Sequence, residues 1–377
     1  MTGEAKADRA VSERSDMDRS GHEALSVECS EGDPLTEGER VEFVRPRVVL
    51  AMAPNVWPQV FDASVRERLA RVAEVDLGRV VADFEDPAHA DALAAAEVLL
   101  TCWGCPPLTA EVLERMPGLR AVVHAAGTVK HHVTEACWER GISVSSAAAA
   151  NALPVAEFTL AAILFAGKRV LPIAARYRRE RSRPEWVEPD ANWGNYGLTV
   201  GIIGASLIGR RVIELLRPFD VEVLVFDPYL GEDEARKLGV RRAELSELAA
   251  ASDVVTVHAP QIPETHHMID RHVLRLMRDG ATLINTARGS LVDTDALTDE
   301  LVAGRLHAVL DVTEPEVLPA SSPLYDLPNV LLTPHIAGSL GNELTRMAGS
   351  ALDELERFAR GMPFDHPVRA EALARSA

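Results

Sequence analysis

Residues 199–216 read TVGIIGASLIGRRVIELL, and they are the most informative segment of the chain. The apolar run at 200–203 predicts a buried strand, which leads into a turn of the form G-x-G-x-x-G and then into a helix. Gly204 permits the tight turn and Gly209 lets helix and strand pack closely, while the N–H groups at the helix start favour a pyrophosphate. Ser206 replaces the middle glycine, and its hydroxyl could donate a hydrogen bond to a phosphate. The stretch predicts a dinucleotide-binding unit.

A carboxylate at the end of the next strand supports this interpretation. The segment VEVLVFD ends at Asp227, and 227 − 204 = 23 residues is near the ~20 expected for the acid that binds the adenosine ribose. The residues after Asp227 are Pro, Tyr and Leu, so no Arg or Lys is there to meet a 2′-phosphate. The pattern therefore favours NAD over NADP. The alternative is a glycine-rich turn in an ordinary α/β domain.

Strand and helix patterns alternate on both sides of this unit, which is typical of parallel sheets covered by helices. Before it, we expect strands at 45–52, 96–101, 119–127 and 142–146, and helices at 109–118, 133–141 and 154–180. After it, we expect strands at 221–227, 252–260, 280–289, 306–312 and 329–334, and a final helix at 341–361. The fold class is α/β, with two parallel-sheet domains around a cleft.

The 377 residues exceed what one hydrophobic core usually supports, so two domains are expected. Residues 1–45 are acidic and lack apolar periodicity, which predicts a disordered tail. We expect a substrate domain built from 46–150 and 336–377, with an NAD-binding domain at 151–335 inserted between its two parts. Closure of the cleft would exclude water from the reaction.

Composition excludes several classes of function. The net charge of 39 − 57 = −18 disfavours nucleic acid and anionic lipid as partners. No apolar run reaches the ~18 residues of a membrane span, and the N-terminus has no apolar signal segment. The four cysteines give no disulfide framework. We therefore expect a cytoplasmic protein whose partner is a small molecule.

Three expected strand ends carry residues suited to one reaction. Arg288 follows the first, Asp311 and Glu316 follow the second, and His335 follows the third. In open parallel sheets, ligands bind beyond these carboxyl ends. A histidine can protonate the alkoxide formed when a hydride reaches a ketone, a carboxylate can orient that histidine, and an arginine can bind a substrate carboxylate bidentately. Each residue alone is as easily a surface or structural one, but together they predict hydride transfer to a 2-keto acid.

The chain at this point resembles the D-isomer-specific 2-hydroxyacid dehydrogenases over residues 46–367. The segments that carry the resemblance are VGIIGASLIGRRV, VFDPYL, VHAPQIPETHHMID, GATLINTARGSLVDTDAL, LDVTEPEVLP and LPNVLLTPHIAGS. It implies that Arg288 binds substrate, that Glu316 pairs with the acid/base His335, and that Asp311 contacts the nicotinamide carboxamide. The implied cofactor-binding residues are Gly204, Ser206, Leu207, Ile208, Asp227, His258, Pro260, Thr286, Ala287 and Asp311.

The same resemblance implies a flavodoxin-like substrate domain, an inserted Rossmann domain and a homodimer. Within the family, the chain resembles phosphoglycerate dehydrogenases and glyoxylate and hydroxypyruvate reductases. Val317 stands where the family often has proline, and HAAGTVKHHV keeps only Gly127 of the family's substrate-domain motif. Substrate identity is thus the part of the resemblance with least support. We also expect that the regulatory domain of some serine-pathway members is absent.

The segment TCWGCP at 101–106 allows three interpretations. A strand–C-x-x-C–helix order suits a redox dithiol, but two prolines follow directly and no second ligand pair completes a zinc site. The family architecture instead makes it a substrate-binding loop, in which Trp103 and Gly104 are the residues of interest. Trp103 is equally well explained as a packing residue. No metal site is expected.

Two other functions stay open on the same scaffold. One is an NAD(H)-sensing, corepressor-like binding protein, and the other is a redox protein that uses Cys102 and Cys105. The intact trio of Arg288, Glu316 and His335 favours the enzyme over both. The histidine pairs at 131–132 and 266–267 are interpreted as surface residues whose side chains point different ways.

Overall fold

The computed structural model describes residues 44–182 and 193–373. The predicted acidic tail therefore lies outside the described residues up to position 43. The prediction was wrong for its last residues, because Val44 and Arg45 belong to the fold. The Arg45 guanidinium donates hydrogen bonds of 2.6 Å to the carbonyl oxygens of Ala70 and Ala73, at the end of a helix.

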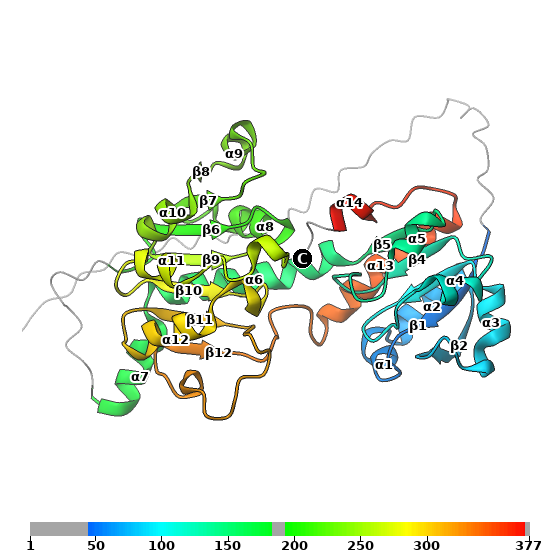
Figure 1. Cartoon of the computed structure of the whole chain (residues 1–377), viewed down its shortest axis with the longest axis horizontal. Coiled ribbons are helices and arrows are strands. Elements are labelled where there is room, and N and C mark those ends of the chain that lie inside the picture. Colours follow the sequence, from blue (N-terminus) through cyan, green and yellow to red (C-terminus); the bar gives the residue numbers. More distant parts are fainter. Residues whose placement is uncertain (1–43, 183–192, 374–377) are drawn as a thin grey trace, which may run out of the picture. The chain divides into compact units, whose positions relative to one another are not determined.

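Two separate sheets form the core of the described chain, and Figure 1 shows helices on both faces of each. The first sheet has six strands in the order β13-β5-β4-β3-β1-β2, of which only β13 runs antiparallel to its neighbour. The order 2-1-3-4-5 within it is the flavodoxin-like arrangement. The strands are β1 (Arg47–Ala51), β2 (Glu74–Val81), β3 (Val98–Thr101), β4 (Ala121–His124), β5 (Ser143–Ser146) and β13 (Pro367–Val368).

Helices from distant parts of the chain cover this sheet. One face packs against α1 (Val56–Val60), α2 (Ala63–Val72) and the amphipathic α13 (Glu343–Ala359), whose apolar side is largely buried there. The other face packs against α3 (Ala90–Ala95), α4 (Ala110–Glu114) and α5 (Glu135–Glu139). The short α14 (Ala370–Leu373) follows β13. The C-terminal segment thus completes a sheet begun by the first strand.

The second sheet has seven parallel strands in the order β12-β11-β10-β9-β6-β7-β8. Counted from its own first strand this is 3-2-1-4-5-6 with one strand added, the order of a dinucleotide-binding fold. The strands are β6 (Leu198–Ile203), β7 (Val221–Phe226), β8 (Arg241–Arg242), β9 (Val254–Val257), β10 (Thr282–Asn285), β11 (His307–Leu310) and β12 (Val330–Leu332). The order reverses between β6 and β9, which is where ligands bind in such sheets.

Two helical layers enclose the second sheet. One contains α6 (Ala148–Gly167), α8 (Leu207–Leu216) and α9 (Glu232–Leu238). The opposite layer contains α10 (Leu245–Ala251), α11 (Arg271–Leu276) and α12 (Thr294–Val302). Short 3-10 turns lie at Pro87–His89, Pro263–Thr265, Gly289–Leu291 and Pro323–Tyr325. Every residue of β9 and β10 is buried, as the continuous apolar runs predicted.

The long helix predicted at 154–180 is two helices, and that prediction was wrong. α6 ends at Gly167, and α7 (Val170–Glu180) begins after Arg169, whose backbone is left-handed with φ 49°. By length and mean hydropathy α6 could cross a membrane, although its apolar run is interrupted. It packs against α8, and its buried Ile163 belongs to the same core cluster as Val200 of β6, so it is a core helix. The domain boundaries at 150/151 and 335/336 stay a prediction.

Candidate active site

The predicted catalytic residues follow three neighbouring strands of the second sheet. β10, β11 and β12 lie side by side in parallel, so their carboxyl ends meet at one edge. Arg288 comes three residues after β10, Asp311 directly follows β11, and His335 comes three residues after β12. Residue types predicted from separate segments are therefore brought together by the strand order.

His335 forms a short contact with Glu316. Its Nδ1 atom lies 2.6 Å from Oε1 of Glu316, and both side chains are about half exposed. His335 has a left-handed backbone, with φ 55°. Its N–H donates to the carbonyl oxygens of Asp311 and Thr333, at 2.9 and 3.1 Å. These bonds fix the backbone of His335, and Glu316 contacts its ring.

Asp311 has a different environment from that of Glu316. Its side chain is buried, and its carboxylate accepts hydrogen bonds from Thr333 Oγ1 at 2.6 Å and from the N–H groups of Ile336 and Ala337 at 2.8 Å each. These three donors flank His335 on both sides. Asp311 therefore organises the loop that carries the histidine. The nicotinamide contact implied by the resemblance stays a prediction.

Arg288 is half-buried, and burial lowers the pKa of its guanidinium while the nearby Glu316 carboxylate raises it. Its Nη1 donates to the carbonyl oxygen of Ala287 at 2.7 Å. Asn285, which the sequence analysis missed, forms two hydrogen bonds to the backbone of the loop that carries Arg288. Its Oδ1 accepts from Ala287 N–H at 3.1 Å and its Nδ2 donates to Arg288 O at 2.8 Å. An amide side chain that ends an apolar strand was the available signal.

The glycines of the dinucleotide motif are required by close backbone contacts. Gly204 has φ 98°, and a Cβ there would lie 2.7 Å from Ala259 N, at the end of β9. A Cβ on Gly209 would overlap the carbonyl oxygen of Gly204. Ser206 caps α8, since its Oγ accepts from Gly209 N–H at 3.3 Å. These contacts leave a cradle of backbone at the point where the strand order reverses, and this cradle fits a dinucleotide pyrophosphate.

Asp227 supports the same turn from the neighbouring strand. Its carboxylate accepts from Ala205 N–H at 2.7 Å and from Tyr229 N–H at 2.8 Å. His258 lies behind the cradle, fully buried, with Nε2 3.0 Å from Thr256 Oγ1. Burial lowers the pKa of His258 to about 3, so the ring is neutral at ordinary pH. This histidine is placed to pack beneath the turn.

A cavity of about 830 Å³ contains most of the predicted residues. The predicted residues that line it are Gly127, Ser206, Leu207, Ile208, Pro260, Thr286, Arg288, Asp311 and His335. The remaining predicted residues, which do not line it, are Trp103, Gly104, Gly204, Asp227, His258, Ala287 and Glu316. Cofactor and substrate residues predicted from distant segments therefore share one cavity.

Comparisons with known proteins agree with this geometry. A profile described as "D-isomer specific 2-hydroxyacid dehydrogenase, NAD binding domain" matches residues 160–337. The glyoxylate reductase of Korarchaeum cryptofilum is 38% identical over 259 residues, which cover 68% of this chain and 77% of that protein. The chain belongs to the D-isomer specific 2-hydroxyacid dehydrogenase family. This family consists of NAD-dependent oxidoreductases, so the predicted NAD-binding domain is confirmed.

Two further relatives define how far the similarity extends. The D-3-phosphoglycerate dehydrogenase of Methanocaldococcus jannaschii is 33% identical over 272 residues, covering 71% of this chain but 50% of that protein. The chain thus spans about half the length of that curated relative. A crystal structure of a phosphoglycerate oxidoreductase from Rhizobium etli superposes with a TM-score of 0.73 at 25% identity, covering 87% of this chain and all of the other. The predicted two-sheet α/β fold is confirmed.

The TCWGCP loop does not have the properties of a redox site. Cys102 and Cys105 are both buried, and burial raises the pKa of each thiol to about 12. Gly104 has φ 79°, and the carbonyl of Trp103 accepts from Ala53 N–H at 2.9 Å. Trp103 itself is 42% exposed. The substrate role of Trp103 and Gly104 stays a prediction.

The interpretation of both histidine pairs was partly wrong. His132 is buried, with its ring centroid 4.5 Å from that of His124, and Thr101 Oγ1 lies 3.3 Å from its Nε2. Burial lowers the pKa of His132 to about 4. The rings of His266 and His267 are at the surface, as predicted, but they stack on each other at 3.9 Å.

Two polar residues of the site were not predicted. Lys130 donates from Nζ to the Gln261 carbonyl at 3.4 Å, and its pKa is lowered by burial and by the charge of Arg288. Asn151, on α6, lines the cavity, and its Oδ1 accepts from Ser339 N–H at 3.0 Å. Neither residue stands at a strand end, so the strand-end argument could not find them.

Proposed function

We propose that this chain is an NAD-dependent oxidoreductase that interconverts a D-2-hydroxy acid and its 2-keto acid. The observation that carries the proposal is the 2.6 Å contact between His335 and Glu316, at the edge of the sheet that also presents Arg288. The relatives named glyoxylate reductase and D-3-phosphoglycerate dehydrogenase support the substrate class. The homodimer and the cytoplasmic location implied earlier stay predictions.

The cofactor supplies or accepts the hydride, while residues of the protein transfer the proton and bind the substrate carboxylate. In the reductive direction, the imidazolium of His335 donates its Nε2 proton to the alkoxide oxygen. Before this transfer, the carboxylate of Glu316 stabilises the positive charge of the ring. Arg288 binds the substrate carboxylate and polarises the adjacent carbonyl. In the oxidative direction, neutral His335 removes the hydroxyl proton. Asp311 keeps the histidine loop in position throughout.

Lys130 provides a second cation close to Arg288. The charge of Arg288 contributes to lowering the pKa of Lys130, so a substrate with a second anionic group would be attracted by both cations. We therefore include dianionic acids in the test. The substrate panel contains glyoxylate, pyruvate, hydroxypyruvate, bulkier aliphatic and aromatic 2-keto acids, and a phosphorylated 2-keto acid.

The test follows NADH absorbance with the purified full chain against this panel. We expect turnover with one class of acid, and a loss of about 10²-fold or more in kcat for His335→Asn and in kcat/KM for Arg288→Gln. Glu85→Gln, which changes an exposed acid in the turn that follows β2, is the matched control and should keep full activity. NADH binding without turnover on any acid would overturn the enzyme proposal in favour of NAD(H) sensing.

A further inference from the structure

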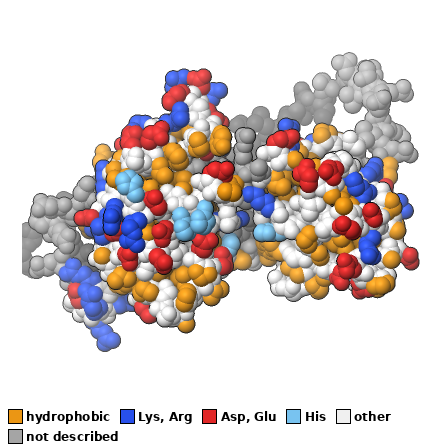
Figure 2. Space-filling view, in the orientation of Figure 1, with side chains coloured by type: hydrophobic (Ala, Val, Ile, Leu, Met, Phe, Trp, Pro, Cys, Tyr) orange, Lys and Arg blue, Asp and Glu red, His pale blue; other side chains and the backbone are white. Residues whose placement is uncertain are grey.

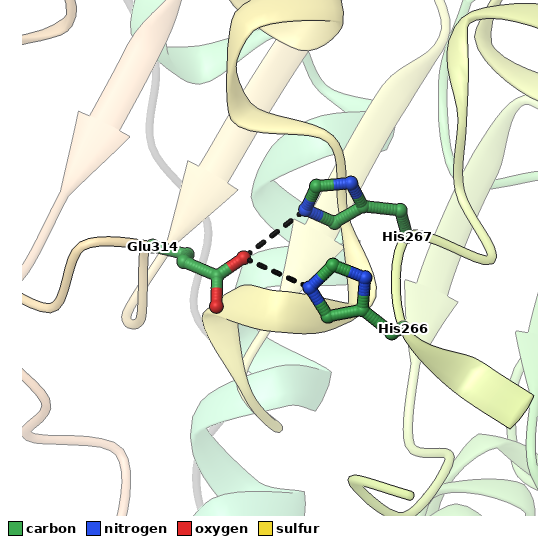
Figure 3. Close-up of side chains that lie close together, drawn as sticks. All are labelled: His266, His267 and Glu314. Atoms are coloured by element: carbon green, nitrogen blue, oxygen red, sulfur yellow. Dashed lines mark hydrogen bonds and ion pairs between the residues drawn. The ribbon is translucent and has the colours of Figure 1, made fainter. Parts of the chain in front are cut away.

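A second cluster of ionisable side chains lies outside the cavity, between two loops of the seven-stranded sheet. Figure 3 shows His266 and His267 stacked, with both rings directed at one carboxylate oxygen of Glu314. Oε2 of Glu314 lies 3.5 Å from Nε2 of His266 and 3.1 Å from Nε2 of His267. All three atoms lie within 4.8 Å of one another. On the surface drawn in Figure 2, histidine side chains gather beside acidic ones in the part that holds this sheet.

The backbone explains why adjacent histidines point the same way. Side chains of consecutive residues diverge in a helix and alternate in a strand. His267 instead has a left-handed backbone, with φ 51°, which turns its ring toward that of His266. Its N–H donates to the Ser290 carbonyl at 2.8 Å, so a neighbouring loop holds this conformation. A rare backbone conformation that is held from outside and gathers polar groups is typical of a functional site.

The spacing of the three atoms suits a transition metal. Zinc bonds of about 2.0–2.1 Å at tetrahedral angles place neighbouring ligand atoms about 3.3 Å apart. The two N–O separations, 3.1 and 3.5 Å, bracket that value. His267 Nε2 and Glu314 Oε2 share a hydrogen bond of 3.1 Å. The stacked rings lie 22° from parallel, so one of them must turn for both Nε2 lone pairs to meet at one ion. A metal ion uses the lone pairs of both neutral rings.

We propose that His266, His267 and Glu314 form a binding site for a divalent transition metal, of which Zn²⁺ is the probe. The side chains are 54%, 40% and 44% exposed, so water would complete the coordination and the ion would exchange with solvent. Two imidazole nitrogens with one carboxylate oxygen select zinc, nickel, cobalt or copper over magnesium and calcium, which prefer oxygen ligands.

The bound ion would join the loop that carries His266 and His267 to the loop that leads to Glu316. Glu314 precedes Glu316 by two residues, and Thr294 Oγ1 holds the Glu314 carbonyl at 2.9 Å. A Cβ on Gly289, directly after Arg288, would overlap the backbone of Thr313, so the Glu314 loop packs against the Arg288 loop. The site does not depend on the proposed reaction, since none of its three ligands lines the cavity.

The test measures Zn²⁺ binding by calorimetry, with Co²⁺ absorption as a second readout of coordination. The protein is the untagged full chain carrying Cys29→Ser, because a cysteine outside the described residues could bind the probe. We expect one site per chain, and affinity at least ~10-fold weaker in His267→Gln and in Glu314→Gln, since even a lost outer-shell partner of a metal ligand costs about 10–100-fold. His272→Gln removes an exposed histidine of α11 that lies outside the cluster and should bind as the parent does.

Equal loss of affinity in His272→Gln, or unchanged affinity in His266→Gln/His267→Gln, would overturn the proposal. The proposal would also be overturned if the parent protein bound no Zn²⁺ at any Zn²⁺ concentration low enough to keep the protein in solution. NADH binding and circular dichroism establish that each variant is folded. If His267→Gln fails these controls, the conclusion depends on Glu314→Gln. That variant should fold, because the Glu314 side chain is exposed and Thr294 bonds to its backbone carbonyl and not to its carboxylate.

Discussion

Glu316 Oε1 and His335 Nδ1 lie 2.6 Å apart, although the two residues follow different strands, β11 and β12. With Nδ1 occupied, Nε2 is the nitrogen left for a substrate oxygen. A carboxylate on the far side of an acid/base histidine fixes both the ring orientation and the tautomer. The pair is therefore the part of the site whose removal should affect turnover most directly.

The first prediction concerns this carboxylate. Glu316→Gln keeps the size of the side chain but removes its charge, so kcat should fall by about 10²-fold while NADH affinity stays within twofold. Steady-state kinetics and NADH fluorescence titration measure the two quantities. Glu316→Asp keeps the charge at a shorter reach and should give an intermediate kcat. Equal kcat in the Gln variant and the parent would remove Glu316 from the mechanism.

The second prediction concerns the cofactor cradle. Gly209→Ala places a Cβ against the Gly204 carbonyl, so the turn must shift and NADH should bind at least ~10-fold more weakly. The matched control is Gly349→Ala, within α13, where a Cβ would meet nothing within 4 Å. That change should leave NADH affinity unaltered and stabilise the fold by roughly 0.5–1 kcal/mol. Equal NADH affinity in the two variants would contradict the assigned cradle.

The third prediction concerns pH and the buried His132. Its pKa is about 4 in the fold and about 6.5 in the unfolded chain, so between these values the unfolded state binds the additional proton. Stability is therefore lost as pH falls from about 6.5 to 4, by roughly 1.4 kcal/mol per unit for this one group. Denaturant unfolding at several pH values should show a shallower loss in His132→Gln than in the parent. A His131→Gln variant, changed at the exposed neighbour, should keep nearly the slope of the parent.

The fourth prediction separates the dehydrogenase from the redox alternative. Because burial raises the pKa of Cys102 and Cys105 to about 12, both thiols stay protonated and shielded at pH 8. Iodoacetamide should leave both unmodified in the native protein and modify both in denaturant, as read by peptide mass spectrometry. Cys105→Ala should retain keto-acid reduction. Rapid native labelling of either thiol, with loss of activity, would restore the redox interpretation.

The sequence predicted the elements that follow simple patterns. The buried strands β6, β9, β10 and β11 stand out as apolar runs, and the residue types after them indicated the chemistry. In contrast, β2 was missed because its exposed and half-buried residues mix polar and apolar types around Gly78. The break between α6 and α7 depends on one left-handed residue, Arg169, which no propensity indicates.

Within the site, residue type was predictable but its surroundings were not. Asp311 was identified as a functional acid, but its three donors come from residues 333–337, which only the tertiary structure brings to it. The direction of the His267 ring is set by a φ angle and by the Ser290 carbonyl. Such details depend on packing between loops, and a pattern along one segment cannot contain them.

The left-handed backbone of His335 determines which replacements can be interpreted. At φ 55°, glycine and asparagine are accommodated well, histidine and aspartate are tolerated, and alanine or a β-branched residue costs energy. A change to alanine would therefore remove the imidazole and also favour rearrangement of residues 333–337. A change to asparagine removes only the imidazole. The same restriction narrows the substitutions open to this position in laboratory evolution, because a new general acid must fit the angle as well as the chemistry.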